Sequence, residues 1–197
     1  MTEAVARPPG RPRSAESHQA IIRAVLELLL EDGFRSLTME GVRARAGVGK
    51  ATIYRRWSSK EELVRDAIVF LDQEFQTPDT GSFRGDYEAI ASMVLASARR
   101  SGAATFMPRL LAEASSDPDL HAIFYANLVA PRRRALREAL ERAVARGELR
   151  DDVDLELAID LLAGPVVYRL LISGGDFSRM FSIDHLLDAV LNGLSPR

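Results

Sequence analysis

The chain has 197 residues, enough for one large domain or for a small and a medium one, and it contains no cysteine. The lack of cysteine excludes a disulfide framework, a thiolate metal cluster and a cysteine nucleophile, and it favours the cytoplasm. The net charge is −2, but residues 1–60 carry eleven Lys or Arg against six Asp or Glu. This basic N-terminal part points to a nucleic-acid partner.

Residues 1–14 are rich in Pro, Gly and Arg, so they predict a flexible basic arm. No apolar run of the kind found in export signals follows the arm, and we expect neither export nor a membrane span. Apolar side chains then recur every three or four positions over 21–29, which predicts an amphipathic helix. Gly33 supplies a left-handed stop for this helix.

The next segment has the spacing of a helix-turn-helix. Thr38 is a suitable N-cap for a short helix over 39–46, with an acidic residue in its first turn. The sequence Gly47-Val48-Gly49 suits a tight turn, after which residues 50–56 form a second short helix. The first helix therefore braces a second one that is placed to enter the major groove of DNA.

The rest of the chain also has a helical pattern. Ser59 and Glu62 match a capping box that starts a fourth helix, and residues 77–82 form a linker. Five further helices are predicted over 86–100, 105–115, 118–146, 153–173 and 182–193. Pro131 lies inside one of them and is expected to kink or split it. The sequence thus predicts an all-α protein of about nine helices: the arm 1–14, a three-helix helix-turn-helix domain over 15–62 and a larger helical domain over 63–197.

Three motifs in the N-terminal part together resemble the TetR family of bacterial regulators. They are Leu37-Thr38-Met39, the run Ala46-Gly47-Val48-Gly49-Lys50-Ala51-Thr52-Ile53-Tyr54-Arg55-Arg56-Trp57, and Ser59-Lys60-Glu61-Glu62-Leu63. The resemblance covers about residues 15–65 by motif, and the remainder only by length and helical layout. It implies a dimeric, DNA-binding transcriptional regulator of a palindromic operator, by family default a repressor, that a small ligand releases.

The resemblance implies eight DNA-binding residues, which are Thr38, Lys50, Ala51, Thr52, Tyr54, Arg55, Arg56 and Lys60. Lys50, Ala51, Thr52 and Arg55 would face the bases, and the other four would bind phosphates. Alternatives stay open: Thr38 as a simple cap, Lys50 and Arg55 as solvated charges, and Tyr54 as partly core. The family often has His and Phe where this chain has Arg56 and Trp57, so Trp57 is expected to pack under the fourth helix instead of contacting DNA.

The run from Pro9 to Arg13 resembles the core of an AT-hook, in which an extended arm lays arginines into a narrow minor groove. Arg11 and Arg13 are the candidates for that contact. The alternative is a disordered basic arm with only general attraction to phosphate.

Two features of the larger domain suggest binding surfaces. Apolar residues surround the predicted helix 153–173 on nearly all sides, so something must cover its second face. The family resemblance implies a two-fold four-helix dimer interface, with Leu162, Val166, Leu170, Leu186, Leu187, Val190 and Leu191 as candidates. It also suggests a cavity for an unidentified apolar or amphipathic effector, with Met93, Phe106, Met107, Leu110, Phe124, Tyr125 and Leu128 as candidate lining; ordinary core is the alternative for each.

An enzyme and a protein-binding adaptor are the two alternative classes of function. For an enzyme, the chain offers three distant histidines, His18, His121 and His185, with no metal-binding spacing and no phosphate-binding glycine loop, so we expect no catalysis, metal or cofactor. A helical adaptor that binds only protein would explain the larger domain, but it leaves the basic helix-turn-helix without a purpose. Binding to a defined palindrome would separate a regulator from an adaptor.

Overall fold

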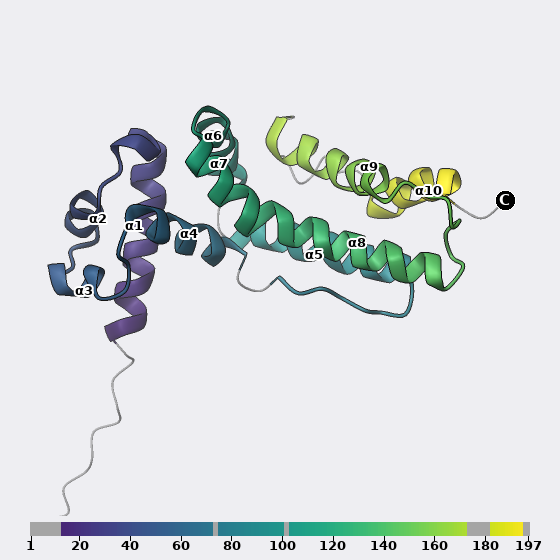
Figure 1. Cartoon of the computed structure of the whole chain (residues 1–197), viewed down its shortest axis with the longest axis horizontal. Helices are drawn as coiled ribbons and strands as arrows, with labels where there is room; N and C mark the ends of the chain where they lie inside the picture. Colours follow the sequence, from purple (N-terminus) through teal and green to yellow (C-terminus); the bar gives the residue numbers. More distant parts are fainter. Residues whose placement is uncertain (1–12, 73–74, 101–102, 173–181, 195–197) are drawn as a thin grey trace, which may run out of the picture. The chain divides into compact units, whose positions relative to one another are not determined.

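A computed structural model of the chain describes residues 13–72, 75–100, 103–172 and 182–194, and every regular element in these ranges is helical (Figure 1). The α-helices are α1 (Arg13–Ser36), α2 (Met39–Ala46), α3 (Lys50–Tyr54), α4 (Lys60–Leu71), α5 (Phe83–Arg100), α6 (Ala103–Ser116), α7 (Pro118–Phe124), α8 (Ala130–Ala145), α9 (Leu155–Val167) and α10 (Ile183–Leu194). Two π-helical turns, η1 (Tyr125–Val129) and η2 (Tyr168–Ile172), join α7 to α8 and extend α9. Nine continuous helices result in the described ranges, which confirms the all-α prediction. None of them is both long and apolar enough to span a membrane.

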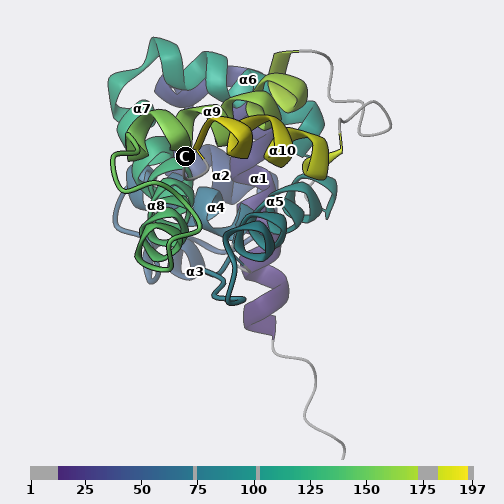
Figure 2. The ribbon, with the colours of Figure 1, turned by 90° about the vertical axis from the view of Figure 1, so that its right-hand side faces the viewer.

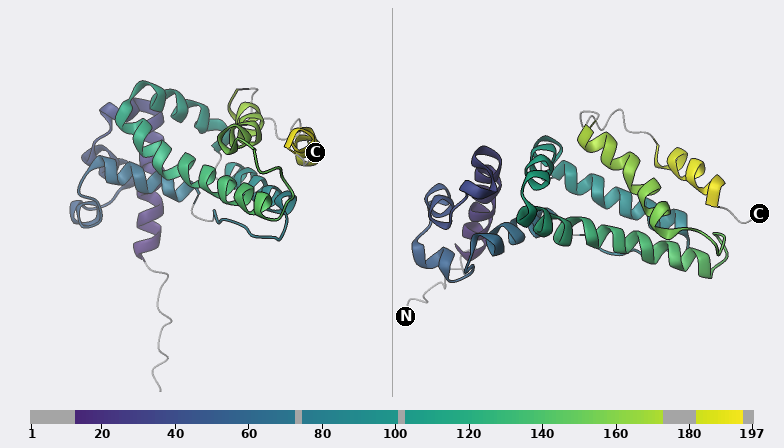
Figure 3. Two further views of the ribbon diagram at one scale, coloured as in Figure 1. Left: turned by 45° about the vertical axis from the view of Figure 1, so that its right-hand side comes forward. Right: turned by 45° about the horizontal axis from the view of Figure 1, so that its top comes forward.

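The chain divides into two compact units, residues 1–67 and 68–197, and α4 runs without a break from one into the other. In the first unit α2 packs on α1 and α3 packs on α2 (Figure 3). The core of this unit includes Ile21, Val25 and Leu29, which are at most 2% exposed. The predicted apolar stripe of the first helix is therefore its buried side. The predicted domain boundary after residue 62 stays a proposal.

The turn between α2 and α3 has the predicted local chemistry. Thr38 Oγ1 accepts a hydrogen bond from Gly41 N at 3.1 Å and so caps α2. Gly47 ends α2 with φ of +66°, a left-handed conformation that favours glycine. Gly33 also has positive φ, +79°, and breaks the helical conformation inside the bounds of α1.

The capping box at the start of α4 is formed only in part. Glu62 N donates to Ser59 Oγ at 3.2 Å, as predicted. The Glu62 carboxylate, however, accepts from Ser58 N and Ser58 Oγ, each at 2.8 Å, rather than from Ser59 N. Ser59 therefore caps the N-terminus of α4 as predicted, while the carboxylate of Glu62 binds Ser58 instead of Ser59.

In the second unit α5 and α8 run side by side, with α9 beside α8 and α10 beside α9 (Figure 2). Their shared core includes Phe83, Leu140 and Ile159, all at most 1% exposed. Tyr87 on α5 donates its hydroxyl to the carbonyl of Leu162 on α9 at 2.8 Å. Burial raises the pKa of the Tyr87 phenol, so this hydroxyl remains a donor.

Pro131 has the predicted disruptive effect, but it does not end the helix. Proline has no N–H, so the carbonyl of Asn127 four residues earlier has no α-helical donor. The backbone responds with the π-helical turn η1 immediately before α8, whose first turn contains Pro131. The segment from α7 to α8 therefore continues as one interrupted helix.

Candidate DNA-binding surface and internal cavity

The short helix α3 presents a basic, polar surface to solvent. Ile53, which is 0% exposed, anchors it to the core of the first unit. Lys50, Tyr54 and, just after the helix, Arg55 are exposed, with 76% of the Lys50 side chain accessible. Ala51 is also exposed. This surface can donate hydrogen bonds to base edges and phosphates, as the resemblance implies.

One carboxylate on α2 faces this basic surface. Glu40 accepts from Arg43 Nε at 2.7 Å and from the Tyr54 hydroxyl at 3.4 Å, and it lies 3.7 Å from Lys50 Nζ. The hydrogen bond from Arg43 lowers the pKa of Glu40, and the charge of Lys50 acts in the same direction. Two candidate DNA-binding side chains therefore contact an ionised carboxylate in the free protein.

Lys60 has a structural role within the unit. Its ammonium donates to the carbonyl of Phe34 at 2.9 Å and of Arg35 at 3.4 Å, and it lies 4.5 Å from the centroid of the Phe34 ring. A cation at carbonyls near the end of α1 satisfies groups that the helix leaves open. Lys60 and Thr38 thus both stabilise helix ends, and their phosphate contacts stay predictions.

Trp57 packs against α4, as expected. Its side chain is 5% exposed, its indole N–H donates to Asp66 at 3.1 Å, and its ring stacks on His18 with centroids 5.7 Å apart. Arg56 is exposed and its guanidinium lies 6.0 Å from the centre of the Trp57 ring, while Thr52 is half-buried. Arg11 and the side chain of Arg13 lie outside the described residues.

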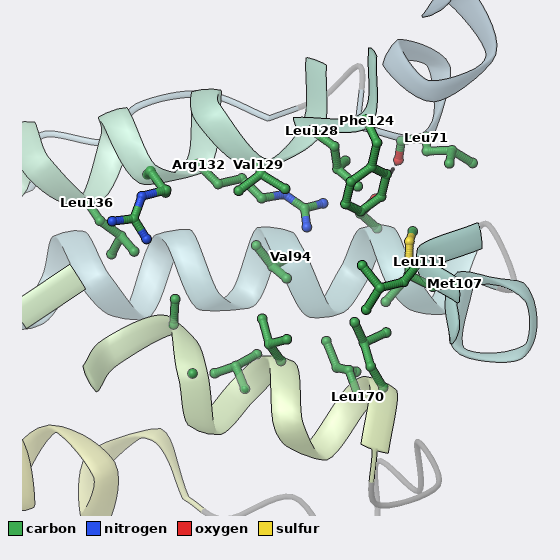
Figure 4. A pocket seen from close by; sticks show the side chains of 18 of the residues that line it. Leu71, Val94, Met107, Leu111, Phe124, Leu128, Val129, Arg132, Leu136 and Leu170 are labelled. Atoms are coloured by element: carbon green, nitrogen blue, oxygen red, sulfur yellow. Dashed lines mark hydrogen bonds between the residues drawn. The ribbon is translucent and has the colours of Figure 1, made fainter. Parts of the chain in front are cut away.

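The second unit contains a cavity of about 420 Å³ between α5, α6, the α7–α8 segment and α9 (Figure 4). Met107, Phe124 and Leu128 line it, as predicted from the sequence. The other candidates lie elsewhere: Leu110 is 0% exposed but does not reach the cavity, and Tyr125 is 45% exposed on the surface.

Met93 packs against the core between α5 and α8, and the side chain of Phe106 lies outside the described part of the chain. These placements show that residue type alone did not separate cavity lining from core.

Polar contacts lie at two places on the otherwise apolar cavity wall. Arg132 donates from Nε and Nη2 to the two oxygens of Asp72, each at 2.9 Å. Nearby, Ser97 Oγ donates to the carbonyl of Leu71, the last residue of α4, at 2.5 Å. Arg133, also on the wall, pairs with Asp160 and Glu156 at 2.5 Å.

The exposed apolar surface of α9 differs from the predicted one. Leu162 and Leu187 are 0% exposed and Val166 is 8% exposed, so their side chains belong to the core of their own subunit. Leu170, Leu186, Val190 and Leu191 are half-buried. The large apolar side chains that α9 and η2 expose are Leu157, Leu161, Val167, Tyr168 and Ile172.

No group of three or more His, Asp or Glu side chains in the described ranges is placed to hold a metal ion.

The chain matches two family models. Residues 21–67 match the model of bacterial regulatory proteins of the tetR family, and residues 77–190 match the tetracyclin repressor-like C-terminal domain. The chain belongs to the TetR family. TetR proteins are DNA-binding transcriptional regulators and not enzymes, and their N-terminal helix-turn-helix binds the DNA.

Relatives extend the TetR match over nearly the whole chain. It is 36% identical to an uncharacterised HTH-type transcriptional regulator, YdeS, of Bacillus subtilis strain 168, over 91% of both proteins. It is 35% identical to a DNA-binding transcriptional repressor of Mycobacteroides abscessus, over 92% of this chain and 93% of the other. Among solved structures, the flavonoid-responsive regulator FrrA superposes with a TM-score of 0.67 at 25% identity, over 93% of this chain and 99% of FrrA.

Sequence reasoning missed the polar groups of both regions of this TetR protein. Glu40 was assigned only a favourable place in the first turn of α2, although its spacing of three from Arg43 indicated an ion pair. Arg132 and Asp72 are 60 residues apart, and no local pattern connects them. Only the packing of α8 near the end of α4 reveals that pair.

Proposed function

We propose that this TetR regulator is a dimeric repressor that binds a palindromic operator and is released when a small apolar or amphipathic molecule occupies the cavity. The exposed basic surface of α3 supports base recognition, with Lys50 and Arg55 as its charged donors. The M. abscessus relative is named a repressor, which supports repression here. A protein that regulates bacterial genes in this way acts in the cytoplasm.

Dimerisation is supported by the exposed apolar side chains of α9 and η2. Five large apolar residues along one helix, each at least 45% exposed, form a surface that a second subunit would cover. In a two-fold dimer the same surface of each subunit meets its partner. The half-buried Leu186, Val190 and Leu191 of α10 would lie at its edge. Two helix-turn-helix units in one particle are what a palindrome requires.

The cavity supports a response to a small molecule. Its volume lies in the range of small-ligand sites, and side chains such as Met107, Phe124 and Leu128 favour an apolar body. FrrA, which shares the fold, is described as flavonoid-responsive. A ligand regulates DNA binding only if it binds the DNA-competent and DNA-incompetent states with different affinity.

The test is binding of the full-length protein to the DNA upstream of its own gene, measured by fluorescence anisotropy across a range of salt concentrations. Wild type should bind one palindromic site tightly. Arg55→Ala should reduce the preference for that site over unrelated DNA by about 1 to 3 kcal/mol. Arg65→Ala, which removes the same charge from an exposed position on α4, should retain the preference.

If the protein binds this DNA without sequence preference, the next experiment is to select its binding sites from fragments of the whole genome. If selection also yielded no preferred site, operator recognition by this chain would be wrong and a protein-binding adaptor would replace it. A specific site that Arg55→Ala leaves unchanged would reject only the role of that residue.

A further inference from the structure

We propose that the cavity of the second unit takes a molecule with an apolar body and one anionic group, and that this group binds Arg132 in competition with Asp72. This inference rests on the proposed ligand response and adds the ligand's chemical class and the ion pair that detects it. Without a ligand, the carboxylate of Asp72 occupies the position on Arg132 that the anionic group of the ligand would take.

The cavity wall combines a large apolar area with a cation that the ligand can reach. Phe124, Leu128 and Leu111 form part of the apolar wall, and Arg132 projects into it from α8 (Figure 4). Arg132 bonds Asp72 through Nε and Nη2, while Nη1 has no hydrogen bond to any residue that the structure describes. An arginine guanidinium is always charged and offers donors in a planar fork that fits a carboxylate. An anionic group in the cavity can therefore make its first contact at Nη1 and then take the place of Asp72 on the rest of the guanidinium.

The pair between Arg132 and Asp72 is more sheltered than the neighbouring one. The side chain of Asp72 is 8% exposed and that of Arg132 is 24% exposed. Arg133 also lies on the wall, but its partners Glu156 and Asp160 are 56% and 64% exposed, so water screens that interaction. The two arginine side chains are about equally exposed, 24% and 27%, but Arg133 already pairs with two carboxylates and Arg132 with one, so an anion gains more at Arg132. Arg133 accordingly serves as the matched control.

Competition at Arg132 would act on the end of α4. Asp72 follows Leu71 directly, and the Leu71 carbonyl is held by Ser97, so two polar contacts from the cavity wall hold this end. For Arg132, exchanging one carboxylate for another is nearly neutral. Asp72 would be left as a sheltered, unpaired charge, which is unfavourable until it reaches water. The last turn of α4 would loosen as Asp72 moves, whereas a neutral ligand would leave the pair intact.

Two fluorescent probes that differ only in one sulfonate group test this proposal. 1-Anilinonaphthalene-8-sulfonate carries one sulfonate, and N-phenyl-1-naphthylamine has the same aromatic body without it. Fluorescence titration of the full-length protein should show tighter binding of the sulfonate probe. Arg132→Gln should weaken that probe about tenfold or more, as loss of a charge-assisted hydrogen bond predicts, and should leave the neutral probe unchanged.

Two further variants separate competition from simple attraction. Asp72→Asn should tighten the sulfonate probe severalfold, because it removes the competing charge, and Arg133→Gln should change it little. The neutral probe reports whether each variant keeps an intact cavity. Equal binding of the two probes to wild type, no binding of either, or equal loss in Arg132→Gln and Arg133→Gln would overturn the proposal.

Hydrogen–deuterium exchange of the amides at 68–72 measures the effect on α4. The sulfonate probe should accelerate exchange there, the neutral probe should not, and Asp72→Asn should exchange fast without a ligand. Unchanged exchange with the sulfonate probe bound would refute the link to α4. DNA binding is measured separately: accelerated exchange without any change in operator affinity would support the anion site while rejecting ligand-controlled release.

Discussion

Glu40 places a negative charge beside the side chains that are proposed to bind DNA. Its carboxylate accepts hydrogen bonds from Arg43 and Tyr54 and lies 3.7 Å from Lys50 Nζ. DNA phosphates would have to compete with it for Lys50 and Tyr54, so Glu40 should weaken binding to any sequence. We expect Glu40→Gln to tighten binding to unrelated duplex DNA by roughly two- to fivefold at low salt, and less at high salt.

Fluorescence anisotropy with an unrelated duplex at two salt concentrations measures this effect. Glu141→Gln makes the same change at an exposed position on α8 and is the control. Equal tightening in both variants would mean that net charge, and not the position of Glu40, controls the affinity.

Asp86 is a second carboxylate whose environment predicts a measurable effect, here on stability. It is 0% exposed and accepts from Arg142 Nη2 at 2.8 Å and from Thr80 N at 2.6 Å. Burial alone would raise the pKa of Asp86, but the hydrogen bonds from Arg142 and Thr80 outweigh it and lower the pKa below the ordinary 3.8. Asp86→Asn should reduce the free energy of unfolding at pH 7 by about 2 kcal/mol.

The lowered pKa also sets the sign of the pH dependence. The stabilisation by ionised Asp86 is fully present above the unfolded value of 3.8 and is lost as the pH falls through the lower folded value. The difference between wild type and Asp86→Asn should therefore shrink below about pH 4, which urea unfolding from pH 3 to 7 can measure. A difference that stays constant over this range would exclude the charge as its cause.

Among the helices, the turn between α2 and α3 depends on one backbone conformation. Gly47 has φ of +66°, and apart from Gly47 and its chain neighbours no atom of the described residues lies within 4 Å of where its Cβ would be. Substitution there should cost only the strain of the left-handed conformation. We expect Gly47→Ala to lower the free energy of unfolding by about 1 to 2 kcal/mol, and Gly47→Asn to lower it less, since Asn tolerates this conformation better. Chemical unfolding of the three proteins gives the order; equal losses would contradict it.

The same helices show how far the sequence alone leads. The bounds of α2 follow from Thr38 and Gly47, because caps and stops are local chemistry that a short motif contains. α5 begins at Phe83, three residues before its predicted start, because its first turn is fixed by distant contacts such as Phe83 N with Glu148. For α9, apolar residues surround the helix, so periodicity could not tell the inner from the outer side.

The candidate site shows the same contrast between features that a local motif contains and contacts between distant segments. Motif resemblance located the exposed residues of α3, since they lie within one short stretch of the chain. It did not predict that Lys60 binds carbonyls at the end of α1, or that Arg132 pairs with Asp72 in the cavity wall. Both contacts join segments that are distant in sequence. They depend on tertiary packing, which no local pattern specifies.

For the protein as an assembly, the exposed side of α9 makes the proposed dimer testable. Leu161 is 45% exposed in the isolated subunit, in line with a position inside the proposed interface. An arginine there would be buried against the partner without a counter-charge, which strongly opposes association. Leu161→Arg should be monomeric, by light scattering after gel filtration, at concentrations where wild type is a dimer. This variant should also bind the full palindrome no more tightly than it binds DNA with a single half-site.

Ala145→Arg introduces the same side chain at an exposed position near the end of α8 and is the matched control. It should remain dimeric and bind the operator as wild type does, because it lies away from the proposed interface. Thermal unfolding would show whether both variants keep the fold of the subunit, since a position that is already exposed tolerates arginine without loss of core packing. A folded Leu161→Arg protein that remains a dimer would place the interface on another surface and remove α9 from the proposal.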